Sequence, residues 1–135
     1  DVLTVGTQNI LQAMKQADVA RFICMSSMGS GSSSKSNGLL FKLIVLFMGL
    51  QESFRAKAVQ EEMLYASNVD FCLVHAGALT DKDHKDLADV ISISSKDLKP
   101  NVWGGPGLIS RAQVAKFMLA ELESPKWTNS TVCIY

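Results

Sequence analysis

Two stretches decide the fold of this chain: RFICMSSMG at Arg21–Gly29, and KAVQEEMLYASNVDFCLVHAGALTD at Lys57–Asp81. In each, an apolar run typical of a buried parallel strand ends in small, hydroxylated or glycine residues. Ligands of α/β proteins bind at this end of the strands, so both stretches have the layout of a nucleotide-binding fold. No G-x-x-G-x-x-G or G-x-G-x-x-G occurs in the chain, so the phosphate-binding first turn is missing. We therefore expect the second half of a larger domain.

The composition is that of ordinary globular protein. The 135 residues, 47% of them hydrophobic, suffice for one modest core. Thirteen basic and thirteen acidic residues give a net charge of zero, so nothing in the charge favours nucleic acid or an acidic membrane as a partner. Cys24, Cys72 and Cys133 are odd in number, and the first two fall in expected buried strands, which favours a soluble protein in a reducing compartment. The chain begins at Asp1 without a leader, as a processed or truncated chain would, so its location is not resolved further.

Helical and strand patterns alternate along the chain. Helices are predicted at 4–17, 51–66 and 111–122, strands at 22–25, 70–75, 89–94 and 131–134, and a turn at NVWGGPG, 101–107. In the second helix, Phe54, Val59, Met63 and Leu64 are expected on the apolar side, with Lys57, Glu61 and Glu62 elsewhere. This alternation predicts an α/β fold. No repeat or linker divides the chain, so residues 1–135 are expected to belong to a single domain.

Two segments between these elements are unusual. Ser26–Gly38, SSMGSGSSSKSNG, is rich enough in serine and glycine to predict a mobile loop, either a lid over a substrate pocket or a surface loop. Part of it resembles a phosphate-binding loop of the form G-x-x-x-x-G-K-[ST], but Ser34 stands at the second glycine position, where a side chain obstructs the required backbone curvature. Leu39–Leu50, LLFKLIVLFMGL, is too short to span a bilayer and predicts a buried helix in preference to a membrane-contacting one.

Three motifs resemble the atypical short-chain dehydrogenase/reductase superfamily, in the order in which that family carries them. They are GTQNILQAMKQADVARFICMSSMG from Gly6, the Lys57–Asp81 stretch with His75-Ala76-Gly77 where the family has Arg-Pro-Gly, and ISRAQVAKFMLAEL from Ile109 with Gln113 in place of aspartate. The resemblance is strongest toward NmrA-like and flavin/biliverdin-reductase-like members. It implies a partial Rossmann-like, three-layer fold with a mostly parallel sheet that uses NADP or NAD. Roughly the C-terminal half of that single domain is present.

The resemblance also implies roles for strand-end and helix residues. Ser27 aligns with the family's serine that faces nicotinamide and substrate, where a hydroxyl can hydrogen-bond a carbonyl under reduction. From the residues alone, Ser26 and Ser27 could equally serve only to satisfy backbone groups at a strand end. Lys57 takes the place of the lysine in Tyr-x-x-x-Lys, which holds the nicotinamide ribose. The alternative for Lys57 is a solvated helix face with a pair to Glu61 at i,i+4.

The tyrosine of that motif is missing, because Ser53 occupies its position. Phe54 cannot transfer a proton, and Tyr65 lies two helical turns beyond Lys57 and is expected to point away from the site. Tyrosine-driven alcohol dehydrogenation is therefore not expected. Hydride delivery to a conjugated acceptor, with the proton drawn from solvent, does not need that tyrosine.

The strand-end segment after residue 74 is expected to bind cofactor together with Ser26 and Lys57. Its members are His75, Ala76, Gly77, Ala78 and Leu79, which would offer backbone amides and small side chains beside the nicotinamide. We expect His75 to line the site without acting as a base. No metal site is expected, because His75, His84 and Cys72 lack paired metal-ligand spacing.

Two functions remain open from the sequence. The first is an NAD(P)H-dependent oxidoreductase that transfers hydride to a small conjugated or carbonyl acceptor, with a nicotinamide dinucleotide and a small-molecule substrate as partners. The second is a non-catalytic, reductase-like structural or assembly subunit that contacts a protein partner through Leu39–Leu50. An upstream strand, G-x-x-G-x-x-G turn and helix would decide between them, because without it the pyrophosphate has no helix N-terminus.

Overall fold

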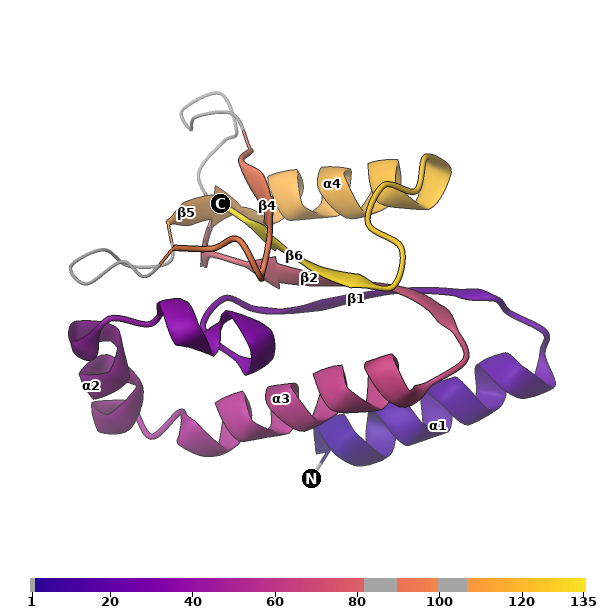
Figure 1. Cartoon of the computed structure of the whole chain (residues 1–135), viewed down its shortest axis with the longest axis horizontal. Helices are drawn as coiled ribbons and strands as arrows, with labels where there is room; N and C mark the ends of the chain where they lie inside the picture. Colours follow the sequence, from indigo (N-terminus) through magenta and orange to yellow (C-terminus); the bar gives the residue numbers. More distant parts are fainter. Residues whose placement is uncertain (1, 82–89, 100–106) are drawn as a thin grey trace.

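The computed structural model describes residues 2–81, 90–99 and 107–135. Its elements, in chain order, are α1 (Val2–Gln16), β1 (Arg21–Ser27), the 3-10 helix η1 (Gly31–Ser36), α2 (Leu39–Phe47), α3 (Gln51–Ala66), β2 (Asp70–Ala76), β3 (Ala78–Thr80), β4 (Ser92–Ser94), β5 (Leu108–Ser110), α4 (Arg111–Glu123) and β6 (Ser130–Ile134). The helices and strands that the sequence predicts occur in the predicted order, with β3 and β5 in addition (Figure 1). Residues 101–106 of the predicted turn, and Asp89 of a predicted strand, lie outside the described residues.

The main sheet has four strands in the order β1-β2-β6-β4. β1, β2 and β6 are parallel, and β4 runs antiparallel to β6 at one edge. A mostly parallel sheet confirms the predicted α/β class. β3 and β5 form a separate parallel pair, which the sequence did not predict because each strand has only three residues and no period can be recognised over that length.

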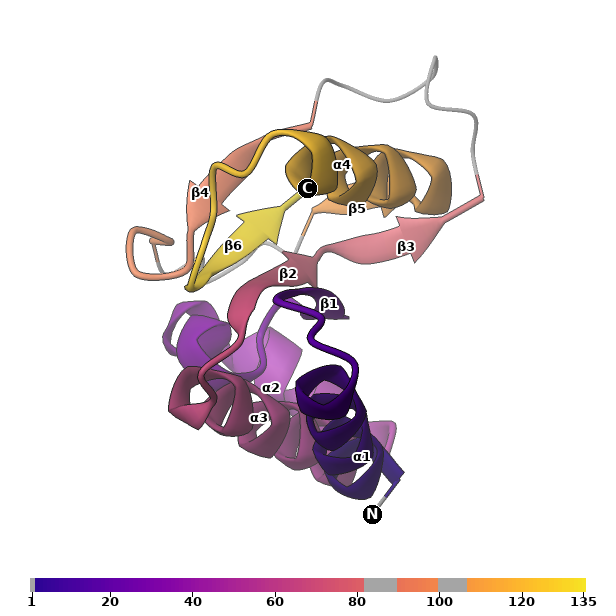
Figure 2. The ribbon, with the colours of Figure 1, turned by 90° about the vertical axis from the view of Figure 1, so that its right-hand side faces the viewer.

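Helices cover the sheet on both faces, with α1 and α3 on one side and α4 on the other (Figures 1 and 2). Successive side chains of β2 point to opposite faces of the sheet, so they belong to two hydrophobic cores. On the α3 side, Phe71 and Leu73 pack with Cys24 and Leu64. On the α4 side, Cys72, Val74 and Ala76 pack with Ile109, Val114, Val132 and Ile134. The result is the three-layer arrangement expected from the sequence.

One edge of the sheet has no partner strand in the described part of the chain. β1 pairs with β2 alone, and the Met25 side chain on β1 is 46% exposed. Parallel sheets are normally covered on both faces and flanked by further strands. The outer edge of β1 therefore carries unpaired backbone groups that a further strand can satisfy.

The serine-rich segment contains regular structure, so the prediction of a loop without it was wrong. Residues 31–36 form η1, and Ser30 and Ser33 are buried. The serines supply the missing hydrogen bonds themselves: Ser33 Oγ accepts from Gly29 N at 2.9 Å, and Ser36 Oγ donates to Ser33 O at 2.7 Å. Short side-chain to backbone bonds of this kind stabilise turns that periodicity cannot reveal.

The prediction of a buried helix at Leu39–Leu50 was also wrong. α2 ends at Phe47 and has no buried residue, and the Phe47 side chain is 86% exposed. The helix lies at the end of the molecule near η1 and the start of α3 (Figure 1). An apolar sequence indicates that burial of the helix is favourable, but it does not show whether the described part of the chain packs against it. None of the described helices is both long and apolar enough to cross a membrane.

Candidate functional site

The predicted strand-end residues meet at the carboxyl ends of β1 and β2. Ser26 lies opposite His75 in the ladder, and Ser27 lies opposite Ala76. The next amides are already used within the fold, since Gly77 N donates to Ile134 O at 2.9 Å and Ala78 N donates to Gly107 O at 2.8 Å. The N–H groups of these two residues are therefore not available to a ligand.

Ser26 and Ser27 face opposite sides of the sheet, as neighbours in a strand must. Ser26 lies on the α3 side with Cys24 and is buried, and its Oγ is 3.5 Å from Ser30 Oγ. Ser27 is half-buried and lies on the α4 side, in phase with Ile23. A ligand that reaches both Ser27 and Lys57 of α3 must lie across the strand ends. The catalytic role of Ser27 stays a prediction.

Lys57 sits on α3 and is half-buried, and desolvation lowers the pKa of its ammonium group. Its Nζ lies 5.8 Å from the centre of the Phe54 ring. Within the described residues Lys57 forms no ion pair, and the carboxylate of Glu61 turns instead toward the sheet. The pair at i,i+4 that the sequence allowed is thus not formed. A desolvated ammonium without a counter-charge suits the hydroxyl or phosphate oxygens of a ligand.

The missing tyrosine has no replacement nearby on α3. Ser53 is exposed. Tyr65 points toward β6, where its hydroxyl lies 3.2 Å from Thr131 Oγ1 and its ring packs edge-on against Phe71 at 4.9 Å. This orientation confirms that Tyr65 faces away from the expected site.

A buried polar cluster lies directly behind the strand ends and was not foreseen from the sequence. Glu61 is 4% exposed and His75 is fully buried, with Glu61 Oε2 3.6 Å from His75 Nε2. His75 Nδ1 is 2.8 Å from Ser33 Oγ. Glu61 was expected on the polar side of α3, and Val59, expected on the apolar side, is exposed. The one signal that pointed to burial of Glu61 was its i,i+3 spacing to Leu64.

Burial sets the charge of His75. Desolvation lowers its pKa to about 4, although the Glu61 carboxylate acts in the opposite direction. The imidazole is therefore neutral near pH 7. It lies between β2, η1 and α3, so it can influence a ligand at the strand ends only through the segments that it supports.

A cavity of about 680 Å³ opens beside the end of β1, between η1, α2 and α3. Phe41 and Phe54 line it and pack edge-to-face, with ring centres 5.9 Å apart. Lys42 and Arg55 also line it, and Glu52 pairs with Arg55 at 3.3 Å. Its volume is in the range of small-molecule sites.

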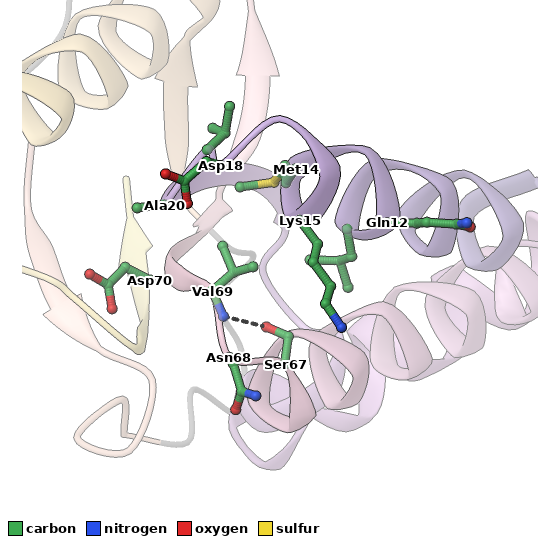
Figure 3. A pocket seen from close by; sticks show the side chains of 11 residues that line it. Gln12, Met14, Lys15, Asp18, Ala20, Ser67, Asn68, Val69 and Asp70 are labelled. Atoms are coloured by element: carbon green, nitrogen blue, oxygen red, sulfur yellow. Dashed lines mark hydrogen bonds between the residues drawn. The ribbon is translucent and has the colours of Figure 1, made fainter.

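A second cavity, of about 650 Å³, lies at the opposite end of the strands. Figure 3 shows Lys15 of α1 reaching toward Ser67, and Asp18, Asn68 and Asp70, the first residue of β2, also line this cavity. These residues surround the amino ends of β1 and β2, whereas α/β proteins bind ligands at the carboxyl ends. We therefore take the cavity beside η1 as the candidate site, although none of the predicted site residues lines it.

The described residues contain no group of three His, Cys, Asp or Glu side chains that could hold a metal ion. His84 lies outside the described residues. Burial raises the pKa of Cys24 to about 11 and those of Cys72 and Cys133 to about 12. The three cysteines are buried, free thiols, and their raised pKa values disfavour the thiolate form that a nucleophile or metal ligand needs.

Several solved structures are similar to this chain in fold. ChuY, described as an anaerobillin reductase from Escherichia coli O157:H7, matches with a TM-score of 0.79 and 18% identity over 99% of this chain and 58% of its own. The oxidoreductase YlbE from Lactococcus lactis matches with a TM-score of 0.73 and 20% identity, over 96% of this chain and 52% of its own. A short-chain dehydrogenase/reductase from Veillonella parvula, in complex with NADP, gives a TM-score of 0.76 and 17% identity, over 97% and 57%.

The chain thus spans a little over half the length of these three proteins. No curated protein matches it in sequence. A family model described as NAD(P)H-binding matches residues 2–125, which is nearly the whole chain. The solved structures agree with it in fold. The chain belongs to the NAD(P)H-binding family.

Proposed function

We propose that the protein is an NAD(P)H-dependent reductase and that residues 1–135 form the C-terminal portion of its single dinucleotide-binding domain. The observation that carries this proposal is the match of the NAD(P)H-binding family over residues 2–125, on a parallel sheet whose carboxyl ends adjoin Lys57, a cation without an ion pair among the described residues. The outer edge of β1 and the coverage of only 52–58% of the similar structures support a further half that pairs with β1.

The residues present fit one end of a dinucleotide. Lys57 holds the nicotinamide ribose, and the absence of an ion pair within the described part of the chain leaves its ammonium group to bind those hydroxyls. Ala78 and the partly exposed side chain of Leu79 provide apolar surface for the nicotinamide face. The pyrophosphate has no glycine-rich turn in this chain, so we assign its binding to the preceding half.

When bound, the reduced nicotinamide supplies a hydride. Ser27 does not line the cavity beside η1, so an acceptor held there must extend across the strand ends for the Ser27 hydroxyl group to orient it. Because Ser53 replaces the tyrosine and cannot serve as an acid of suitable pKa, the proton comes from solvent.

The acceptor class follows from the cavity beside η1. Two phenyl rings give it flat apolar walls, and two cations with one carboxylate leave it with a net positive rim. This lining suits a flat, conjugated acceptor that carries negative charge. Phe54 also contacts the Lys57 ammonium, so the cavity adjoins the cofactor end of the site. One structural relative is described as an anaerobillin reductase, which supports an acceptor of this kind.

Substitution of Lys57 tests the cofactor role. In the full-length protein, Lys57→Ala should weaken NADPH binding roughly tenfold, the loss expected for one charge-assisted hydrogen-bonding group. Lys96→Ala, an exposed lysine in the turn after β4, is the matched control and should bind NADPH normally. Equal NADPH affinity in the Lys57 and Lys96 variants would contradict the role of Lys57.

Ser27→Ala should lower turnover by about 10²-fold or less without changing NADPH affinity.

The second candidate is a non-catalytic, reductase-like subunit that binds a protein partner through α2. The exposed apolar side chains of α2, among them Leu39, Leu40 and Phe47, favour it, as does Ser53 in place of tyrosine. Full-length protein that binds no NAD(P)H, but forms an assembly that Phe47→Glu disrupts, would support this candidate in place of the reductase.

A further inference from the structure

Glu61 is a buried carboxylate that holds the serine-rich segment from inside. Its Oε2 accepts a hydrogen bond from Ser32 N at 3.0 Å, and its Oε1 accepts one from Thr131 Oγ1 at 2.9 Å. It therefore links α3 to η1 and to β6. Hydrogen bonds to a buried charged group are among the stronger ones, and the loss of one partner leaves the other unsatisfied.

The backbone of the segment is shaped to fit this carboxylate. Gly31 has φ of +46°, a conformation that favours glycine, and a Cβ added there would lie within 2.9 Å of Glu61 Cδ. Gly49, between α2 and α3, provides a comparison, because its φ is +65° but nothing lies within 4 Å of an added Cβ. A side chain at position 31 therefore meets Glu61 in addition to the backbone strain that both positions share.

His75 forms the second attachment, through a hydrogen bond with Ser33 whose direction depends on the tautomer of the imidazole. Ser33 Oγ carries one proton and lies 2.9 Å from Ser30 O and 2.8 Å from His75 Nδ1. If that proton went to Ser30 O, His75 would have to donate from Nδ1, and its bare Nε2 would face Glu61 Oε2 at 3.6 Å. If Ser33 donates to Nδ1, an Nε2–H group faces the carboxylate. His75 Nε2 has no hydrogen-bond partner among the described residues. The charge of Glu61, 3.6 Å away, nevertheless favours this second arrangement, in which Ser33 is hydrogen-bonded to His75 and the Nε2–H group is turned toward the carboxylate.

The segment held in this way forms a wall of the cavity beside η1. We call Gly29–Asn37 the serine loop. Gly29 and Gly31 line the cavity, and Asn37 Nδ2 donates to Gly29 O at 2.7 Å, which closes the loop on itself. Ser32 Oγ also donates to Ser95 Oγ at 2.9 Å, so the loop touches the region after β4. A shift of the loop away from Glu61 would change the shape of the cavity.

We propose that Glu61 is a positioning residue that acts with His75 to fix the serine loop as the wall of the acceptor cavity. That this cavity binds the acceptor rests on the proposed function, whereas the attachment of the serine loop to Glu61 and His75 does not. Glu61 does not touch the reacting atoms. It sets where the loop lies and, through the loop, which acceptors the cavity admits.

Hydrogen-deuterium exchange of the full-length protein tests the attachment. Glu61→Ala should speed exchange of a peptide covering residues 29–37 roughly tenfold or more, because a hydrogen bond to a charged group is lost there. Glu61→Gln, which keeps an acceptor oxygen and nearly the same volume, should restore most of the protection. Glu62→Ala, at the exposed neighbouring position, is the matched control and should leave that peptide unchanged.

The glycine pair tests the same attachment without altering Glu61. Gly31→Ala should release the serine loop, with faster exchange in residues 29–37, whereas Gly49→Ala should not. If Glu61→Ala does not fold, the exchange of residues 29–37 in the two glycine variants still tests the attachment. Unchanged exchange of residues 29–37 in Gly31→Ala would overturn the proposal.

A nitrogen NMR spectrum of His75 tests which ring nitrogen carries the proton. We expect a protonated Nε2 and a bare Nδ1 in the wild-type protein, and a larger Nδ1–H population in Glu61→Gln, where the charge that favours Nε2–H is absent. An Nδ1–H tautomer in the wild type would overturn the part assigned to His75. None of these readouts uses NAD(P)H, so loss of cofactor binding would refute the proposed function alone, and unchanged loop exchange would refute the positioning role alone.

Discussion

At the scale of single residues, His75 makes the stability of the protein depend on pH. Its pKa is about 4 in the fold and near 6.5 when unfolded, so between these values the unfolded state binds more protons. Stability contributed by neutral His75 is fully present above pH 6.5 and is lost as the pH falls toward 4. The loss at the low end is on the order of 3 kcal/mol. Glu61 and Lys57 are the charged groups that face the imidazole.

Urea unfolding at a series of pH values measures this effect. The wild-type free energy of unfolding should fall between pH 6.5 and 4 more steeply than that of His75→Gln, which cannot gain the proton. Parallel slopes for the two proteins would contradict a buried, neutral His75.

Much of the candidate site at this scale could be predicted from sequence. Ser26, Ser27, His75 and Ala76 were expected at two strand ends, and the ladder places them side by side. Glu61 could not be found, because a carboxylate on an amphipathic helix is usually solvated, and its partners lie 29 and 70 residues away along the chain. Long-range hydrogen bonds of this kind leave no local pattern.

At the scale of elements, α4 begins with a reciprocal capping box. Ser110 Oγ accepts from Gln113 N at 3.1 Å, and Gln113 Oε1 accepts from Ser110 N at 2.9 Å. Gln113 thus accepts the hydrogen bond from Ser110 N, although the family that this chain resembles has aspartate at that position. Ser110→Ala should lower the free energy of unfolding by about 1 kcal/mol.

Chemical denaturation measures that loss directly. Lys116→Ala, on the exposed face of the same helix, serves as the control and should change stability little. A Ser110→Ala protein as stable as the Lys116 variant would show that the box does not stabilise α4.

The elements also show where sequence prediction failed. Long periodic segments such as α1, α3 and α4 were expected within a few residues of their observed bounds. The serine loop was missed because its order comes from serine hydroxyls and Glu61 rather than from an apolar stripe. α2 was recognised as a helix, but its exposure depends on what surrounds it in three dimensions.

At the scale of the whole molecule, the main sheet of the described chain has β1 as an open edge. Its three parallel strands, two helix layers and open β1 edge fit the mostly parallel α/β fold that the strand patterns predict. The absence of a glycine-rich turn from the sequence agrees with coverage of only 52–58% of the three similar proteins. The proposed acceptor class could not be read from sequence, because the cavity on which that proposal rests is assembled from η1, α2 and α3 only on folding.

In our proposal these strand ends serve a nicotinamide cofactor. The most direct test is a titration of the full-length protein with NADPH and NADH, followed by the change in nicotinamide fluorescence. We predict saturable binding of at least one of the two, with a dissociation constant of roughly 1 μM to 1 mM. A full-length protein that binds neither NADPH nor NADH at millimolar concentration would contradict the proposed cofactor role.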